Sequence, residues 1–371
     1  MTRSRAFLSS LLLPLLLLVA APIVRADNNG QLQDQLRKAA DLSTPNIAGL
    51  KPWHSKISVQ LYTLKGDPAG TGTVEEWWMT PGNEKRVFAF PDYQGSEIIT
   101  SDGIYRSPNL ISEPMLLADV IDQFVNPMAA EDKTGGVKPI ARTLQLGGVS
   151  LPCVMLAKTN SRVANQPIGF YPSWCTEPGK DALRVFVDDG GIAVIRNGIS
   201  SFQGKDIPVD VGISLNGTTL ASAHLMDISM DGMPTAPFTP DRDMVKAVKP
   251  VELKGKKFEN QADKHEPPDF SQAAGVRDQS TRNINGALQG DIEMRVWVGE
   301  DGQIRDMLLL SYPDPGVAQT AFDTVRRWTF RPVMQEGRAV PFTGTLDFEI
   351  NKGFEVNGVH RMSGPGGPAI Q

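Results

Sequence analysis

Gly286-Ala-Leu-Gln-Gly-Asp-Ile-Glu-Met-Arg-Val-Trp-Val-Gly-Glu-Asp-Gly302 is the stretch that decides the fold of the C-terminal part of this 371-residue chain. From Ile292 to Val298 every second residue is apolar, and this period of two predicts a β-strand with one buried face. The two glycines at 299 and 302, with acidic residues between them, then predict a tight turn into a second strand over 304–311.

A helix and a third strand follow. Pro313-Asp-Pro315 ends the second strand and begins a helix with one apolar face. That face is formed by Val317, Ala321, Phe322, Val325 and Trp328. After a turn at 336–338, a final strand over 340–350 carries one predicted buried face: Val340, Phe342, Gly344, Leu346, Phe348 and Ile350. The sequence therefore predicts a small ββαβ domain over 269–352 and, from its Gly and Pro content, a disordered tail over 353–371.

Four motifs in this order resemble the C-terminal domain of the TonB energy transducers. They are Gly290-Asp-Ile-Glu-Met-Arg-Val296, Glu300-Asp-Gly-Gln-Ile304, the run from Ala321 to Trp328-Thr-Phe-Arg-Pro332, and Gly337-Arg-Ala-Val340. The residues that carry the resemblance are expected to hold the fold rather than to act chemically: Trp328, Phe330, Pro332 and Gly337.

The resemblance implies a docking function. In TonB-like domains the last strand is exposed and pairs with an extended segment of an outer-membrane transporter, so main-chain hydrogen bonds supply the affinity. The partner-binding edge strand would then comprise Phe342, Gly344, Leu346, Phe348 and Ile350. The implied partner is an outer-membrane transporter or another envelope protein, in TonB-dependent transmembrane transport. The alternatives are that this strand pairs within the chain or in a homodimer.

Residues 1–26 have the pattern of a signal peptide. A basic start precedes an apolar run over 6–24, and Val24-Arg-Ala26 fits the small-x-small cleavage rule. We expect cleavage after Ala26 and a periplasmic protein. The alternative is an uncleaved inner-membrane anchor formed by residues 6–24, a run just long enough to span a bilayer. TonB itself has an anchor with a Ser/His face, and residues 1–26 contain no histidine, which favours docking over the transmission of force.

Residues 27–231 predict a second, larger domain. A short amphipathic helix from Leu32 ends before Pro45, and alternating strands then run from residue 53 to residue 228, interrupted by a helical stripe over 113–126. Such a pattern predicts one curved antiparallel sheet with helices on its concave side. Gly72-x-Val-Glu-Glu-Trp77, Lys85-Arg-Val-Phe88 and Ile99-Thr-Ser-Asp-Gly-Ile-Tyr105 resemble the outer-membrane lipoprotein carrier (LolA-like) half-barrel. The fold class predicted for the whole chain is α+β.

The half-barrel suggests an alternative function, a periplasmic lipid or lipoprotein carrier or chaperone. A carrier needs an apolar cavity, and the candidate lining residues are Trp77, Trp78 and Phe124. Adjacent residues of a strand point to opposite faces, so only one of the two tryptophans can line it. Ordinary core packing is the other interpretation of these aromatic residues.

Residues 232–268 predict a Pro/Lys linker between the two domains. Prolines recur at 234, 237, 240, 250, 267 and 268, and lysines lie among them. Such a stretch is expected to be extended and solvated rather than packed.

Cys153 and Cys175 are the two cysteines of the chain. An exported protein meets an oxidising compartment, so a disulfide is the default expectation. Closing this short loop would stabilise the fold by about 3 kcal/mol in the chain-entropy model. A reactive thiol pair is the alternative, although no CxxC spacing is present.

No catalytic or cofactor motif stands out. The four histidines, at 54, 224, 265 and 360, lack metal-ligand spacing, and neither a nucleophile elbow nor a phosphate-binding glycine loop occurs. We therefore expect a non-enzymatic protein without metal or cofactor, an exported enzyme of another type being the third hypothesis. A net charge of −5 argues against nucleic acid as a partner.

Overall fold

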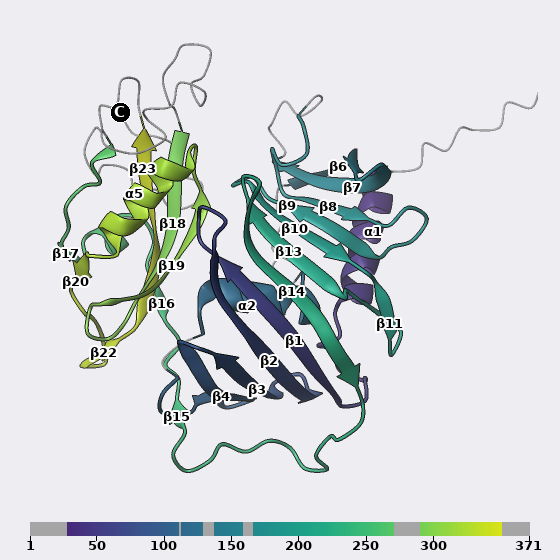
Figure 1. Ribbon diagram of the computed structural model, residues 1–371, viewed down its shortest axis with the longest axis horizontal. Coiled ribbons are helices and arrows are strands. Elements are labelled where there is room, and N and C mark those ends of the chain that lie inside the picture. The colour runs from purple at the N-terminus through teal and green to yellow at the C-terminus, as the bar shows by residue number, and fades with distance from the viewer. Residues whose placement is uncertain (1–27, 111–112, 129–136, 159–165, 271–289, 351–371) are drawn as a thin grey trace, which may run out of the picture.

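The computed structural model describes residues 28–110, 113–128, 137–158, 166–270 and 290–350, and Figure 1 shows their arrangement. The predicted signal peptide over 1–26 and the predicted tail over 353–371 lie outside these residues. Two bodies are visible, a large curved sheet and a smaller sheet with a helix, as the α+β prediction requires.

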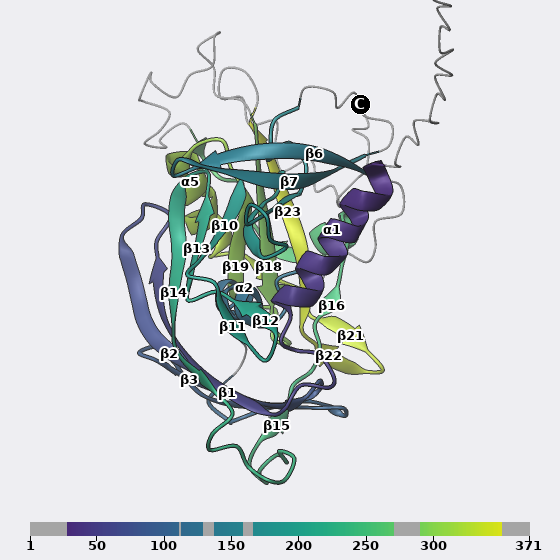
Figure 2. The same cartoon turned by 90° about the vertical axis from the view of Figure 1, so that its right-hand side faces the viewer.

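The large body is one 13-stranded sheet in which all neighbouring strands are antiparallel. Its order in space is β15 (Val245–Lys246), β5 (Gly103–Arg106), β4 (Tyr93–Thr100), β3 (Asn83–Phe90), β2 (Pro68–Thr80), β1 (Trp53–Tyr62), β14 (Thr218–Ser229), β13 (Asp210–Leu215), β10 (Ile192–Asn197), β9 (Leu183–Val187), β8 (Ser173–Thr176), β7 (Val149–Lys158) and β6 (Val137–Leu146). The sheet bends strongly without closing, because β15 and β6 remain separate ends (Figure 2). The predicted half-barrel is confirmed.

Helices cover the concave side of this sheet, as predicted. They are α1 (Asn28–Ser43) and α2 (Met115–Val125), and the hairpin of β11 (Ser200–Phe202) and β12 (Lys205–Ile207) lies beside them (Figure 2). The apolar stripe of α2 packs with the inward-facing residues of β1, β2, β3, β13 and β14 in one cluster. The face of α1 that contains Ala39 packs on Val154, Trp174 and Leu183. The two helices thus bury the apolar face that alternation along the strands creates.

The small body is a four-stranded sheet in the order β16 (Val251–Glu252), β23 (Phe342–Ile350), β18 (Gly290–Val298) and β19 (Ile304–Ser311). Helix α5 (Pro315–Val325) covers one face, and Asp314 begins it by accepting hydrogen bonds from the main-chain nitrogens of Gly316 and Val317 at 2.8 and 3.0 Å. The short strands are β17 (Ala262–Lys264), β20 (Thr329–Phe330), β21 (Val333–Gln335) and β22 (Arg338–Val340). Val340 belongs to β22 rather than to the final strand, since Pro341 separates the two.

The segment expected to be a solvated linker is packed in its second half. Strand β15 extends the large sheet, β16 extends the small one, and the short helix α3 (Lys256–Glu259) places Phe258 in the small core with no exposed surface. The main-chain oxygen of Glu266 accepts a hydrogen bond from Trp328 Nε1 at 2.9 Å. The part of the predicted linker around Phe258 is therefore packed, because Phe258 fills a space that Gly344 of β23 leaves open, whereas Val245 of β15 is exposed.

The two bodies share a core. Leu215 and Leu220 of the large sheet belong to the same buried cluster as α5 and β18. Tyr312, which follows β19, donates its hydroxyl to the main-chain oxygen of Leu215 at 3.1 Å and accepts at its own main-chain oxygen from the side chain of Asn216 at 2.7 Å. Asp306 of β19 accepts a hydrogen bond from the main-chain nitrogen of Met115, the first residue of α2, at 2.5 Å.

Candidate functional site

Strand β23, the predicted docking strand, is bordered unequally on its two sides. On one side β18 pairs with it along its whole length, from Val298 opposite Phe342 to Gly290 opposite Ile350. On the other side β16 pairs with it in parallel, and only at Phe342 and Thr343. In the part of the chain that the structure describes, no further strand is paired with β23 on that side. Strand β23 therefore lies between two strands at Phe342 and Thr343, and forms the edge of the small sheet beyond Thr343.

The hydrogen bonds to β16 identify which main-chain groups face this open side. Val251 donates its main-chain N–H to the oxygen of Pro341 at 2.9 Å, and Leu253 donates to the oxygen of Thr343 at 2.8 Å. Both main-chain groups of a strand residue point to the same side, and successive residues alternate. The N–H and C=O of Thr345 consequently face the same side as those of Thr343, away from β18.

The side chains predicted for the docking edge face the core instead. Phe342, Leu346, Phe348 and Ile350 are all buried, with at most 4% of any of them exposed. Gly344 lies between them on the same face, and a Cβ atom there would collide with the ring of Phe258. These five residues therefore pack β23 against the core of its own domain. The side chains available to contact an added strand would be those of the residues that alternate with them along β23.

The residues that carry the resemblance lie in the core and in a turn, as expected for residues that stabilise the fold. Trp328 and Phe330 are buried in the small core, and Phe330 donates its main-chain N–H to the oxygen of Gly302 at 2.9 Å. Glu336 and Gly337 both have positive φ, 51° and 78°, in the two-residue turn between β21 and β22. Positive φ at both positions is the geometry of a type I′ hairpin turn, which favours glycine.

The residues proposed to line an apolar cavity lie on two different faces of the large sheet. Trp78 and Phe124 lie in the same packed cluster on the concave side, where Trp78 stacks on Trp53 with ring centroids 5.8 Å apart. The indole N–H of Trp78 donates to Asn46 Oδ1 at 2.9 Å. Trp77 lies on the opposite face of β2 and stacks on His54 at 4.6 Å. Trp77 therefore does not face the concave side.

A network of buried charges lies on the strands next to α2. Arg86 forms ion pairs with Glu76, Glu84 and Glu113 at 3.0, 3.4 and 3.9 Å. Burial alone would lower the pKa of Arg86, and these carboxylates raise it instead. Burial raises the pKa of Glu113 to about 7, although the charge of Arg86 opposes the rise. Within the described residues no group of three or more His, Cys, Asp or Glu side chains could hold a metal ion.

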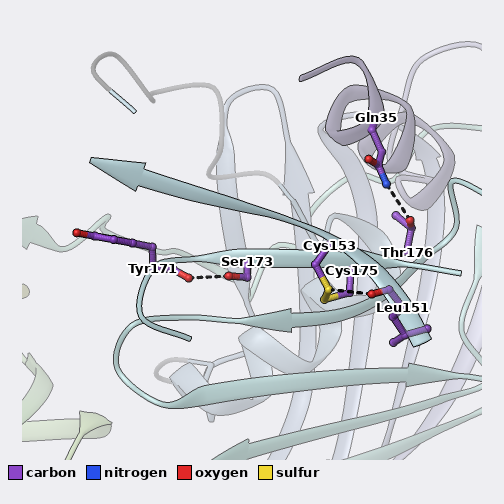
Figure 3. Close-up of a disulfide and its surroundings, with 7 residues drawn as sticks. All are labelled: Gln35, Leu151, Cys153, Tyr171, Ser173, Cys175 and Thr176. Atoms are coloured by element: carbon purple, nitrogen blue, oxygen red, sulfur yellow. Dashed lines mark hydrogen bonds between the residues drawn. A yellow bond between two sulfur atoms is a disulfide. The ribbon is translucent and has the colours of Figure 1, made fainter. Parts of the chain in front are cut away.

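The predicted disulfide is confirmed. Cys153 of β7 and Cys175 of β8 are opposite each other in the sheet, are both buried, and are bonded sulfur to sulfur (Figure 3). Thr176, the next residue, accepts a hydrogen bond from Gln35 of α1 at 3.1 Å. The bond therefore joins two strands at the place where α1 is attached to the sheet, which is a structural role.

Sequence reasoning missed Arg196. Its side chain is among the largest that are fully buried in the described residues. The alternation of β10 predicts which face it occupies, but nothing in the local sequence distinguishes a buried arginine from one that reaches solvent.

Comparisons with known proteins agree with the resemblance of the C-terminal domain. Residues 281–350 match the family described as "Gram-negative bacterial TonB protein C-terminal". No curated protein matches the chain. No helix among the described residues has both the length and the apolar character needed to cross a membrane.

Several solved structures are similar to the chain, among them the following three. A LolA superfamily protein of Nitrosomonas europaea is 10% identical, with 55% of this chain and 94% of that one covered and a TM-score of 0.34. A domain described as an outer membrane lipoprotein-sorting protein, from Vibrio parahaemolyticus, is 10% identical, with 56% and 94% covered and a TM-score of 0.33. A DUF1329 family protein of Desulfovibrio piger is 7% identical, with 56% and 95% covered and a TM-score of 0.33.

Proposed function

We propose that this chain is a non-enzymatic envelope protein that docks on a partner by adding an extended segment of that partner to β23. The observation that carries the proposal is the unequal border of β23, since β16 pairs with it only at Phe342 and Thr343. The main-chain donor and acceptor of Thr345 face the side where a further strand would add, and such an addition is the geometry of β-augmentation. The match of residues 281–350 to the TonB C-terminal family supports an outer-membrane transporter or another envelope protein as the partner.

The carrier alternative has less support. A carrier would use the concave side of the large sheet, and there α2 packs directly on the strands, with Trp78 and Phe124 in its cluster. Mass spectrometry of protein purified from its native envelope tests this alternative, because a carrier would retain lipid. Protein free of lipid would leave docking as the sole proposal of the two.

A proline in place of Thr345 tests the docking proposal. Thr345→Pro removes a main-chain N–H that faces away from β18 and leaves the ladder between β18 and β23 intact, so the fold is expected to persist. Thr345→Val is the matched control, because it keeps the N–H. The wild-type protein and T345V should retain an outer-membrane protein from envelope extracts of the native host, and T345P should lose it. Equal retention by T345P, with circular dichroism showing an intact fold, would refute docking through β23.

We also propose a periplasmic location after removal of residues 1–26. N-terminal sequencing of the native protein should begin at Asp27. A protein that begins at residue 1 or 2 and remains in the inner-membrane fraction would support the anchored alternative, in which residues 6–24 stay in the bilayer.

A further inference from the structure

Arg196 of β10 is a buried charge on the concave side of the large sheet. Only 1% of it is exposed. Val194, two residues earlier, belongs to the buried cluster beneath α2, and residues two apart in a strand point to the same face. On the neighbouring strand β13, Val211 of the same cluster is opposite Arg196. The guanidinium group thus lies in apolar surroundings.

Among the residues that the structure describes, this guanidinium has no hydrogen-bond partner. Its nitrogens Nε, Nη1 and Nη2 are all buried and none has an acceptor among the described residues. Arginine carries five N–H donors and no acceptor, so an empty set of acceptors leaves every donor unsatisfied. Leaving a buried donor unpaired is costly, and more so when the group is charged.

Comparison with Arg86 shows that the fold can pair a buried arginine. The side chain of Arg86 is 11% exposed, and its nitrogens form ion pairs with three carboxylates at 3.0 to 3.9 Å. The charge of Asp206 on β12 acts on Arg196, yet no ion pair joins the two side chains. Burial lowers the pKa of Arg196 to about 9, with Asp206 opposing this shift, so the guanidinium remains protonated at neutral pH.

A second arginine, Arg184, contacts the main chain of Arg196 but gives its guanidinium no hydrogen-bond acceptor. Arg184 of β9 donates its Nε to the main-chain oxygen of Arg196 at 2.7 Å, and its other nitrogens bond Glu177 and Asn197. Arg184 therefore bonds the main chain of Arg196 and supplies no acceptor for its guanidinium.

We propose that Arg196 binds an oxyanion, a carboxylate or phosphate group, on the concave side of the large sheet. Both groups offer two oxygens in the spacing that the guanidinium fork accepts in a bidentate fashion. Binding would satisfy donors that the chain itself leaves open, and the apolar surroundings would strengthen the charge-assisted bonds. The inference concerns the large sheet and is independent of docking through β23.

The hairpin of β11 and β12 supplies the acidic residue whose charge acts on Arg196. It carries Asp206, and side-chain hydrogen bonds attach it to the segment around α1: Lys205 Nζ bonds the oxygen of Asp41 at 2.6 Å, and the amide of Gln203 bonds the main chain of Lys51 twice at 2.9 Å. An entering anion would be repelled by Asp206, so Asp206→Asn should tighten binding of the anion.

Thermal unfolding of the full-length mature protein tests the proposal. Two probes are added in parallel at constant ionic strength, inorganic phosphate and decanoate. At about 100 times the Kd either probe should raise the Tm by about 3–5 °C. A rise with phosphate alone indicates a free anion as the ligand, whereas a rise with decanoate alone indicates the head group of an amphiphile. No rise in Tm with either probe would overturn the proposal.

Three variants assign the effect to Arg196. Arg196→Met removes the charge at similar volume and should abolish the rise in Tm, whereas Arg338→Met, at an exposed arginine of the hairpin between β21 and β22, should retain it. Arg196→Lys keeps the charge without the planar fork and should bind at least tenfold more weakly. An equal rise in Arg196→Met would refute the assignment. If that variant does not fold, an unchanged affinity in Arg196→Lys would refute it in the same way.

Discussion

Gly344 and Phe258 form a contact between residues that lie far apart in the chain. Phe258 occupies the space where a side chain of Gly344 would be, and its ring lies 5.2 Å from Phe330 and 5.9 Å from Phe342, centroid to centroid. The alternation of β23 predicted that Gly344 faces the core. It could not predict which residue packs against Gly344, because Phe258 belongs to a segment without hydrophobic periodicity. This is the reason why the packed part of the presumed linker was missed.

The substitution Gly344→Ala should destabilise the protein. A methyl group would collide with the Phe258 ring, and overpacking of this kind costs about 1–3 kcal/mol. Gly212→Ala is the matched control, since Gly212 lies in strand β13 and no atom comes within 4 Å of its would-be Cβ. Urea unfolding should give a lower midpoint for G344A and an unchanged or higher midpoint for G212A. Equal midpoints would contradict the tight contact.

Glu113 gives the protein a pH dependence of stability. Burial raises its pKa from 4.5 to about 7, and Asp122 behaves likewise, with a pKa of about 6. A raised carboxyl pKa means that the folded state binds protons more readily than the unfolded state, so the free energy of unfolding should increase as the pH falls from about 8 to about 5.

The variant Glu113→Gln separates this residue from the other acids. It should stabilise the protein by on the order of 2 kcal/mol at pH 8 and change little at pH 5, where Glu113 is already protonated. Urea unfolding at both pH values measures the difference. A stabilisation that is the same at both would show that Glu113 does not titrate in this range.

At the scale of elements, a residue of β19 caps the N-terminus of helix α2. The residue before α2 is Pro114, and it makes no side-chain hydrogen bond to the helix. Asp306 of β19 accepts the bond from the main chain of Met115 instead, at 2.5 Å. A carboxylate at a helix N-terminus stabilises it through this bond and through the helix dipole. A helix of the large body is thus capped by a strand of the small one.

Removal of this cap should loosen α2. Asp306→Ala is expected to cost about 1 kcal/mol, the usual effect of losing a capping side chain. Hydrogen exchange should become faster at the first amides of α2 and remain unchanged in α5, which has its own cap in Asp314. The control Asp323→Ala removes an exposed carboxylate of α5 and should leave α2 unchanged. Unchanged exchange in α2 of D306A would contradict the capping role.

The long elements could be predicted from the sequence, and the two-residue strands of the presumed linker could not. Strands such as β1 and β18 alternate over nine or ten residues, and α2 has a continuous apolar stripe, so periodicity located them. Strands β15 and β16 contain two residues each and have no period to detect. Because β16 determines how much of β23 remains at the edge, the extent of the candidate docking site also escaped sequence reasoning.

At the scale of the molecule, the two bodies should unfold together. Leu215 and Leu220 share a buried cluster with α5 and β18, and Tyr312 bonds the main chain of Leu215. Because separation would expose that cluster, we expect a single transition in calorimetry, with the calorimetric and van't Hoff enthalpies equal. Two resolved transitions would show that the bodies are independent. Tyr312→Phe should lower the transition temperature without splitting it, since it removes one hydrogen bond.

The cap on α2 also has a consequence for the order of folding events after export. In an exported chain that enters the periplasm N-terminus first, the strands of the large sheet and α2 emerge before Asp306 and Tyr312. Until then Leu215 and Leu220 lack their cover, and the first main-chain N–H of α2 lacks its acceptor. The emerging chain would therefore pass through a stage in which a nearly complete large sheet exposes an apolar patch, and a periplasmic holding chaperone would recognise it at that stage. Residues of the small body thus complete the packing of the large one.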